Sequence, residues 1–126
     1  MKIITEQFGE VEFNEEHVIQ FNAGVLGFES LTRYLFIKTD DALFYWLNSV
    51  DKPDLCFPVV GIRLIDDSFP VVENHEAFGI VNLNRDPLKI TINLKAPVYI
   101  NQDEKRGYQK VIDDSKYPID YKLFVE

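Results

Sequence analysis

The sequence contains few of the residues that hold a fold together by covalent or metal bonds. It has a single cysteine, Cys56, so it can form neither an internal disulfide nor a cysteine-rich zinc site. Its two histidines, His17 and His75, are far apart in the chain, and neither has a second histidine or a cysteine at ligand spacing. We therefore predict no metal site and no cofactor, and we expect the fold to depend on its own apolar core.

Long hydrophobic runs are also missing. The chain begins Met1-Lys2-Ile3-Ile4-Thr5-Glu6, where charged residues interrupt the apolar ones before the hydrophobic segment of a signal peptide could form. No stretch approaches the roughly 18 apolar residues that a membrane-spanning helix needs. We expect a soluble, cytoplasmic protein that does not associate with membranes.

Basic residues are scarce: 13 Lys and Arg stand against 21 Asp and Glu, a net charge of −8. The imbalance lies in residues 1–88, which hold 15 acidic and 6 basic side chains. Nucleic acid binding needs Lys and Arg to neutralise phosphates, so this composition disfavours direct binding to nucleic acid and favours a basic protein partner. Acidity that serves only solubility is the alternative, and the composition leaves it open.

Hydrophobic residues make up 46% of the 126 residues and include ten Phe and six Tyr, which is enough for one packed domain over residues 1–126. Short runs of alternating or apolar residues are separated by Gly, Pro, Asn and Asp, and no amphipathic helix of useful length appears. The pattern predicts an all-β fold, a small antiparallel β-barrel of short strands with at most short helical turns; a sandwich would fit the same pattern. The predicted strands cover residues 3–7, 10–13, 18–21, 34–38, 43–49, 55–62, 78–83, 90–94, 98–101, 107–112 and 121–125. We expect a helical turn within 29–33, a hairpin turn at Asp40-Asp41, and Pro58 at a strand edge or bulge because it lacks an amide donor.

The run Phe44-Tyr45-Trp46-Leu47 places four bulky side chains in succession. Because side chains alternate across a strand, one pair must point away from the primary core unless both faces are covered. An exposed aromatic pair is typical of a binding hot spot. A loop such as residues 22–33 folded over the pair is the alternative.

The residues that could carry catalysis do not form a recognisable constellation. Adjacent carboxylates, such as Asp66-Asp67, point to opposite faces of a strand and more often stabilise turns. Cys56 lies within an apolar run, where a thiol usually packs as a small buried hydrophobe. We therefore predict no catalytic residue and no enzymatic activity.

Four segments stand in order along the chain. They are Gly24-Val25-Leu26-Gly27-Phe28-Glu29; Phe44-Tyr45-Trp46-Leu47-Asn48-Ser49-Val50-Asp51 with Pro53-Asp54-Leu55-Cys56-Phe57; Asn93-Leu94-Lys95-Ala96-Pro97-Val98-Tyr99-Ile100-Asn101; and Gly107-Tyr108-Gln109 with Tyr117-Pro118. Together they resemble the FliW family of flagellar assembly factors. The sequence departs from the family at Asn48, where Gln is common, and in residues 63–79, which are shorter than the corresponding stretch of typical members.

The resemblance implies a cofactor-free β-barrel that binds flagellin and also binds CsrA, a small basic RNA-binding regulator that represses flagellin translation. The two partners would compete for the protein, which we expect to be a monomer. Candidate partner-binding residues are Phe44, Trp46, Asp51, Asp54, Asp66, Asp67, Glu73 and Glu76. The residues expected to maintain the family's structure are Gly24, Gly27, Phe28, Pro97, Asn101 and Gly107.

Two alternatives come from other functional classes. One is a diverged barrel that binds a small ligand or catalyses hydrolysis with an Asp or Cys56; the other is a structural subunit of a different assembly.

Overall fold

The computed structural model describes residues 1–39 and 43–125, in which all regular secondary structure is strand or 3₁₀ helix. The strands are β1 (Lys2–Thr5), β2 (Gly9–Glu12), β3 (Val18–Gln20), β4 (Arg33–Lys38), β5 (Tyr45–Ser49), β6 (Cys56–Gly61), β7 (Glu76–Asn82), β8 (Thr91–Ile92), β9 (Val98–Asn101), β10 (Arg106–Gln109) and β11 (Tyr121–Lys122). The 3₁₀ helices are η1 (Glu15–His17), η2 (Ile62–Leu64) and η3 (Pro87–Lys89).

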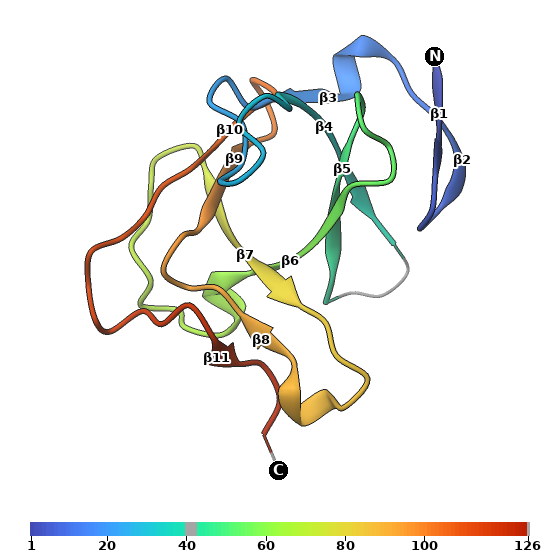
Figure 1. Ribbon diagram of the computed structural model, residues 1–126. Helices are drawn as coiled ribbons and strands as arrows, with labels where there is room; N and C mark the ends of the chain where they lie inside the picture. The colour runs from blue at the N-terminus through green and yellow to red at the C-terminus, as the bar shows by residue number, and fades with distance from the viewer. Residues whose placement is uncertain (40–42, 126) are drawn as a thin grey trace.

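Seven strands close into a barrel that Figure 1 shows end-on. The hydrogen-bonded order is β3-β4-β5-β6-β7-β9-β10, and β10 returns to β3 to complete the ring. Neighbouring strands are antiparallel except β10 and β3, which meet in parallel at a single pair, Arg106 with Gln20. The structure confirms the predicted all-β barrel with short helical turns and adds this one parallel contact.

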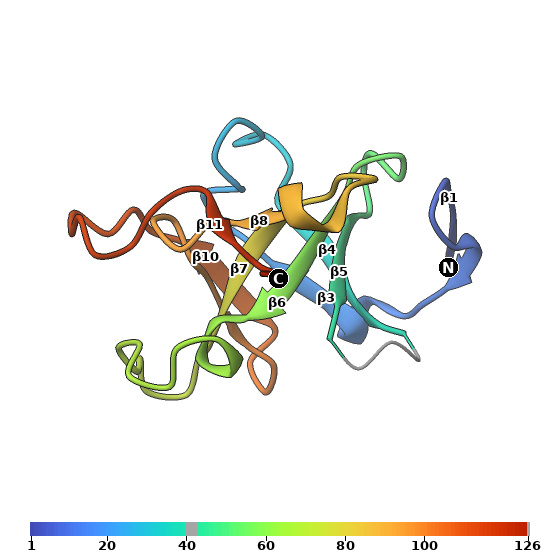
Figure 2. The same cartoon turned by 90° about the horizontal axis from the view of Figure 1, so that it is seen from below.

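Two additions lie outside the ring. The β1–β2 hairpin forms a separate two-stranded sheet, and β8 and β11 extend the sheet beyond the far half of β7. Figures 1 and 2 both show the hairpin on one side of the barrel and the segment after β10 on the other. These additions cover parts of the outer surface of the barrel.

Apolar residues accordingly form three clusters. One fills the barrel interior and includes Tyr34, Leu47 and Phe78. A second lies under the hairpin, around Ile3 and Phe13. The third joins the outer surfaces of β6, β7 and β9 to the 62–72 segment and the C-terminal residues. Because several strands are covered on both faces, their sequences carry bulky residues in succession rather than in strict alternation.

Most strand predictions are correct within two residues, and the errors lie at ends and loops. Residues 29–33 do not form a helical turn; Val25 and Phe28 form an isolated β-bridge, and a tight turn with Leu31 N–H donating to Phe28 C=O at 3.0 Å leads into β4. The last strand covers only two residues instead of five. Pro58 pairs with Trp46 of β5 and lies just beyond the pairing of β6 with β7, which begins at Val59, so its missing amide breaks no bond to β7. The turn predicted at Asp40-Asp41 lies outside the described residues.

Candidate partner-binding surfaces

Phe44 and Trp46, the aromatic pair among the candidate partner-binding residues, are both half-buried. Tyr45 and Leu47 face the barrel interior, so the alternation was predicted correctly. Phe8, from the turn of the β1–β2 hairpin, packs edge-on against Trp46 with ring centroids 5.7 Å apart. The hairpin therefore covers part of this face. This covering segment differs from residues 22–33, the alternative to an exposed pair that we expected from the sequence.

Of the acidic candidates, Asp51 and Asp54 lie in the turn after β5, and both are exposed. The carboxylate of Asp51 accepts a hydrogen bond from Arg33 Nη1 at 3.1 Å, and the same guanidinium pairs with Glu15. Figure 2 shows this turn at the end of the barrel that also carries the 22–32 loop. One of the two charges is thus already paired within the chain.

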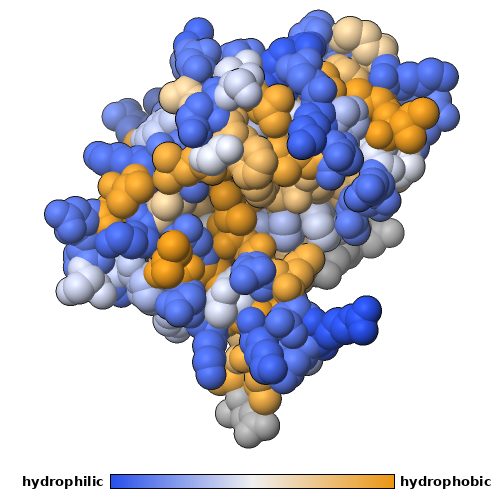
Figure 3. All heavy atoms as spheres, in the orientation of Figure 1, coloured by the Kyte–Doolittle hydropathy of each residue, from blue (hydrophilic) through white to orange (hydrophobic). Residues whose placement is uncertain are grey.

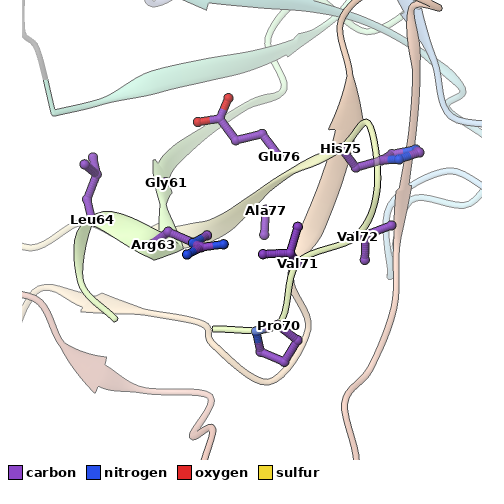
Figure 4. Close-up of a pocket in the computed structure, with 9 residues that line it drawn as sticks. All are labelled: Gly61, Arg63, Leu64, Pro70, Val71, Val72, His75, Glu76 and Ala77. Carbon is purple, nitrogen blue, oxygen red and sulfur yellow. The ribbon is translucent and has the colours of Figure 1, made fainter. Parts of the chain in front are cut away.

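The other four acidic candidates, Asp66, Asp67, Glu73 and Glu76, belong to the 61–77 segment, which forms a hollow at the opposite end of the barrel. Of the four, Glu76 lines the hollow and the others lie in the same segment. The structure therefore does not bring all eight candidate residues onto one surface. We call this region the acidic hollow; its volume is about 250 Å³. Leu64 and Val71 border it and are 71% and 69% exposed. In Figure 4 the ring of His75 and the carboxylate of Glu76 point away from Val71 and Pro70.

Local hydrogen bonds shape the acidic hollow. Asp66 Oδ1 accepts from the hydroxyl of Ser68 at 2.5 Å and from its N–H at 3.0 Å, and these bonds hold the pKa of the Asp66 carboxyl below its usual value. Arg63 donates to the backbone oxygen of Asp67 at 2.7 Å, which leaves the Asp67 carboxylate to solvent. The ring of His75 contacts Glu73 O through Nδ1 at 2.8 Å and packs against Tyr108. The 61–77 segment carries four carboxylates and one arginine beside exposed aliphatic side chains, which suits a partner segment that is both basic and apolar.

A second hollow, which the sequence did not predict, lies at the other end of the barrel. We call it the mouth. It has a volume of about 490 Å³ and is lined by Val25, Leu26, Phe57, Ile80, Asn93, Lys95, Ala96, Gln109, Val111 and Ile119. Figure 3, in the end-on orientation of Figure 1, shows hydrophobic residues gathered across the middle of the visible face. The mouth could not be predicted from local sequence patterns because its lining residues lie far apart in the chain and are brought together only by the fold.

Three of the residues expected to maintain the structure lie in the loop that supplies Val25 and Leu26 to the mouth. Gly24 has a φ of +68°, and a Cβ there would lie 2.6 Å from the Cα of Glu29. Gly27 also has a positive φ, +89°, and its N–H donates to Glu29 Oε2 at 2.7 Å. Phe28 packs edge-on against Phe57 at 5.5 Å. The loop therefore needs glycine at two positions to bring Leu26 to the rim.

The other three lie in and beside β9 and β10. Gly107 permits the ring of Phe21 to approach, because a Cβ would come within 2.4 Å of Phe21 Cζ. Pro97 is buried, and its carbonyl accepts from Lys110 N–H at 3.2 Å. Asn101 is buried and accepts from Glu104 N–H at 3.0 Å, which stabilises the turn before β10.

Cys56 and His17, which were considered as catalytic or metal-binding residues, have surroundings typical of residues that stabilise the fold. Burial raises the pKa of the Cys56 thiol to about 11, so the thiol is neutral at physiological pH and poorly suited to act as a nucleophile. His17 Nδ1 accepts the Asn14 N–H at 3.0 Å, an ordinary turn-stabilising contact. Within residues 1–39 and 43–125, no group of three or more His, Cys, Asp or Glu side chains is arranged to hold a metal ion. The same part of the chain has no helix that could cross a membrane.

A family model described as FliW protein matches residues 2–123. The chain is 38% identical over 142 aligned residues to the flagellar assembly factor FliW of Caldanaerobacter subterraneus subsp. tengcongensis, covering 100% of this chain and 95% of the relative. It is 35% identical to the Caldicellulosiruptor bescii protein of the same name, covering 93% of this chain and 86% of that protein. The corresponding Bdellovibrio bacteriovorus protein is 30% identical, with 100% and 81% covered.

A crystal structure of the flagellar assembly factor FliW superposes on this fold with a TM-score of 0.91, covering 100% of this chain and 99% of the other at 22% identity. The fold defines a small β-barrel protein with a hollow at each end of the barrel, the acidic hollow and the mouth. With the family match over almost the whole chain, the resemblance seen in the sequence is confirmed: the chain belongs to the FliW family.

Proposed function

We propose that this protein acts in flagellar assembly as a non-enzymatic binding module that binds flagellin and antagonises CsrA by partner switching. The observation that carries the proposal is the FliW match over residues 2–123, together with relatives named flagellar assembly factors. We place the protein in the cytoplasm as a monomer. The raised pKa of Cys56 weighs against the alternative of a cysteine hydrolase.

The acidic hollow is the surface that we assign to a basic partner such as CsrA. Asp67, Glu73 and Glu76 are exposed there, and Glu76 also borders a neighbouring depression with Asp103. Exposed charges of one sign accelerate the encounter with a partner of the opposite sign, and the acceleration decreases as salt rises. The net charge of −8 adds a long-range attraction for any basic protein.

Partner switching needs only competition for a shared binder. When flagellin leaves the cell, the free protein captures CsrA and relieves repression of the flagellin messenger. When flagellin accumulates, it occupies the protein and CsrA is released. The switch is mass action between two complexes, and no chemical step is required.

Isothermal titration of the purified protein against CsrA and against flagellin from the same cell tests the proposal, followed by titration of CsrA into the preformed flagellin complex. We expect binding to each partner alone and mutual exclusion in the competition. Binding to flagellin alone would contradict the regulatory half and would locate the loss in residues 63–79. Binding of a folded sample to neither partner would contradict the whole proposal.

A further inference from the structure

We propose that the mouth is a second interaction site, which binds an apolar peptide segment carrying a carboxylate, with the carboxylate against Lys95. The site lies at the end of the barrel away from the acidic hollow, and it does not depend on the identity of the partners proposed above.

The first argument is the combination of volume and lining. At about 490 Å³ the mouth has roughly twice the volume of the acidic hollow, about 250 Å³. Phe57 and Ile80, which are partly buried and pack against the barrel interior cluster, form part of its lining. Ligand sites are typically hollows of this size with apolar walls and a few polar groups.

The second argument is the exposure of the rim. Leu26 comes from the 24–28 loop, and Val111 and Ile119 come from the 109–119 segment; the three converge on the mouth and are 54%, 51% and 63% exposed. Single exposed aliphatic residues are ordinary on protein surfaces, but a contiguous group around a hollow is typical of an interaction site. A rim of this kind suits aliphatic side chains of a partner.

The third argument is charge. Lys95 is the one charged residue among those that line the mouth, and in the described part of the chain its ammonium forms no ion pair. An acidic molecule of net charge −8 repels an anionic partner over most of its surface, so an unpaired cation in an apolar setting selects where a carboxylate can bind.

The remaining polar groups of the mouth are already used within the chain. Gln109 accepts from Leu26 N–H at 2.8 Å and donates to Ala96 C=O at 2.9 Å. Asn93 Oδ1 accepts from the N–H groups of Lys95 and Ala96, both at 3.0 Å. The mouth thus offers apolar contact and one positive charge, which matches leucine-like side chains beside a C-terminal carboxylate.

The test uses a synthetic N-acetylated pentapeptide of glutamine and leucine with a free C-terminal carboxylate, and the same peptide with a C-terminal amide. Binding is followed by ¹H–¹⁵N NMR titration of the full chain. We expect shifts confined to residues 24–28, 57, 80, 93–96 and 109–119, with tighter binding of the acid. Equal binding of acid and amide would overturn the role of Lys95, and shifts confined to residues 61–77 would overturn the site.

Variants separate the two contributions. Lys95→Gln removes the charge, keeps part of the aliphatic stem and should weaken binding of the acid peptide about two- to fivefold, as expected for a partly exposed ion pair, while leaving the amide nearly unchanged. Ile119→Ser should weaken both peptides about tenfold, because it removes apolar contact. Lys52→Gln and Leu64→Ser, at exposed positions outside the lining of the mouth, are the matched controls. An effect of the control variants equal to that of Lys95→Gln and Ile119→Ser would overturn the proposal.

Discussion

The acidic hollow and the mouth differ in how the chain builds them. The hollow comes from one continuous stretch, residues 61–77, held by local bonds such as those between Ser68 and Asp66. The mouth joins residues from the 24–28 loop, β6, β7, the 93–96 loop and the 109–119 segment. A continuous site can vary with little effect on the barrel, whereas an assembled site changes whenever the packing of the barrel changes.

The largest expected effect is a difference in stability between two glycine substitutions, one at Gly24 in the loop beside the mouth and one at Gly61 in the acidic hollow. Gly24→Ala should destabilise the protein by about 2–4 kcal/mol, because an alanine must adopt φ +68° and its Cβ would meet the backbone of residues 28 and 29. Gly61→Ala should change stability by less than about 0.5 kcal/mol, because its Cβ would lie at ordinary contact distance, 3.7 Å, from Glu76 and Leu64. Urea unfolding of both variants measures the difference, and equal costs would contradict it.

Charge reversal tests which acidic group guides a basic partner. We expect Asp67→Lys with Glu73→Lys to slow CsrA association by roughly one to two decades at low salt, and less at high salt. Asp51→Lys with Asp54→Lys should have a smaller effect, since Arg33 already pairs with Asp51 at 3.1 Å. Stopped-flow association rates at two salt concentrations distinguish the pairs. A larger effect of the Asp51 and Asp54 pair would move the basic partner to the other end of the barrel.

Gln109 provides a way to loosen the mouth alone. Gln109→Ala removes the acceptor of Leu26 N–H and the donor to Ala96 C=O, which should cost about 1–2 kcal/mol. We expect faster amide hydrogen exchange at Leu26 and its neighbours and unchanged exchange in residues 62–76. Equal acceleration in both regions would show that they are coupled, contrary to the comparison above.

The same difference explains what the sequence could predict. Strand positions follow from local alternation and turn residues, so most were correct, including β9 at both ends. The four carboxylates of the 61–77 segment lie within eleven consecutive residues, Asp66 to Glu76, so their closeness is visible in the sequence itself. The helical turn expected in 29–33 failed because a β-bridge between Val25 and Phe28 and the turn after it determine that loop.

What could not be predicted depends on contacts between distant segments. The hairpin that covers Trp46 does so through Phe8, 38 positions earlier in the chain, and no local pattern indicates which segment covers an outer face. The mouth has the same character, since Gln109 bonds to Leu26 across 83 positions. The one local signal was Leu26 itself, an aliphatic residue in a loop between Gly24 and Gly27.

The smallest expected effect concerns the carboxyl of Asp66 in the acidic hollow. The Ser68 hydroxyl, followed by the Ser68 N–H, lowers its pKa in the folded protein, so the ionised form favours the fold above the unfolded pKa. That contribution is lost as pH falls through the lowered folded pKa. Ser68→Ala should raise the Asp66 pKa toward its ordinary value and make unfolding less steep in this acidic range, as measured by carbon-detected NMR titration and acid unfolding. Ser30→Ala, at an exposed loop position, is the control. An unchanged Asp66 pKa in Ser68→Ala would mean that the backbone N–H alone sets it. Binding of the acid peptide at the mouth should be unaffected, because the hydroxyl belongs to a site built from its own neighbours in sequence.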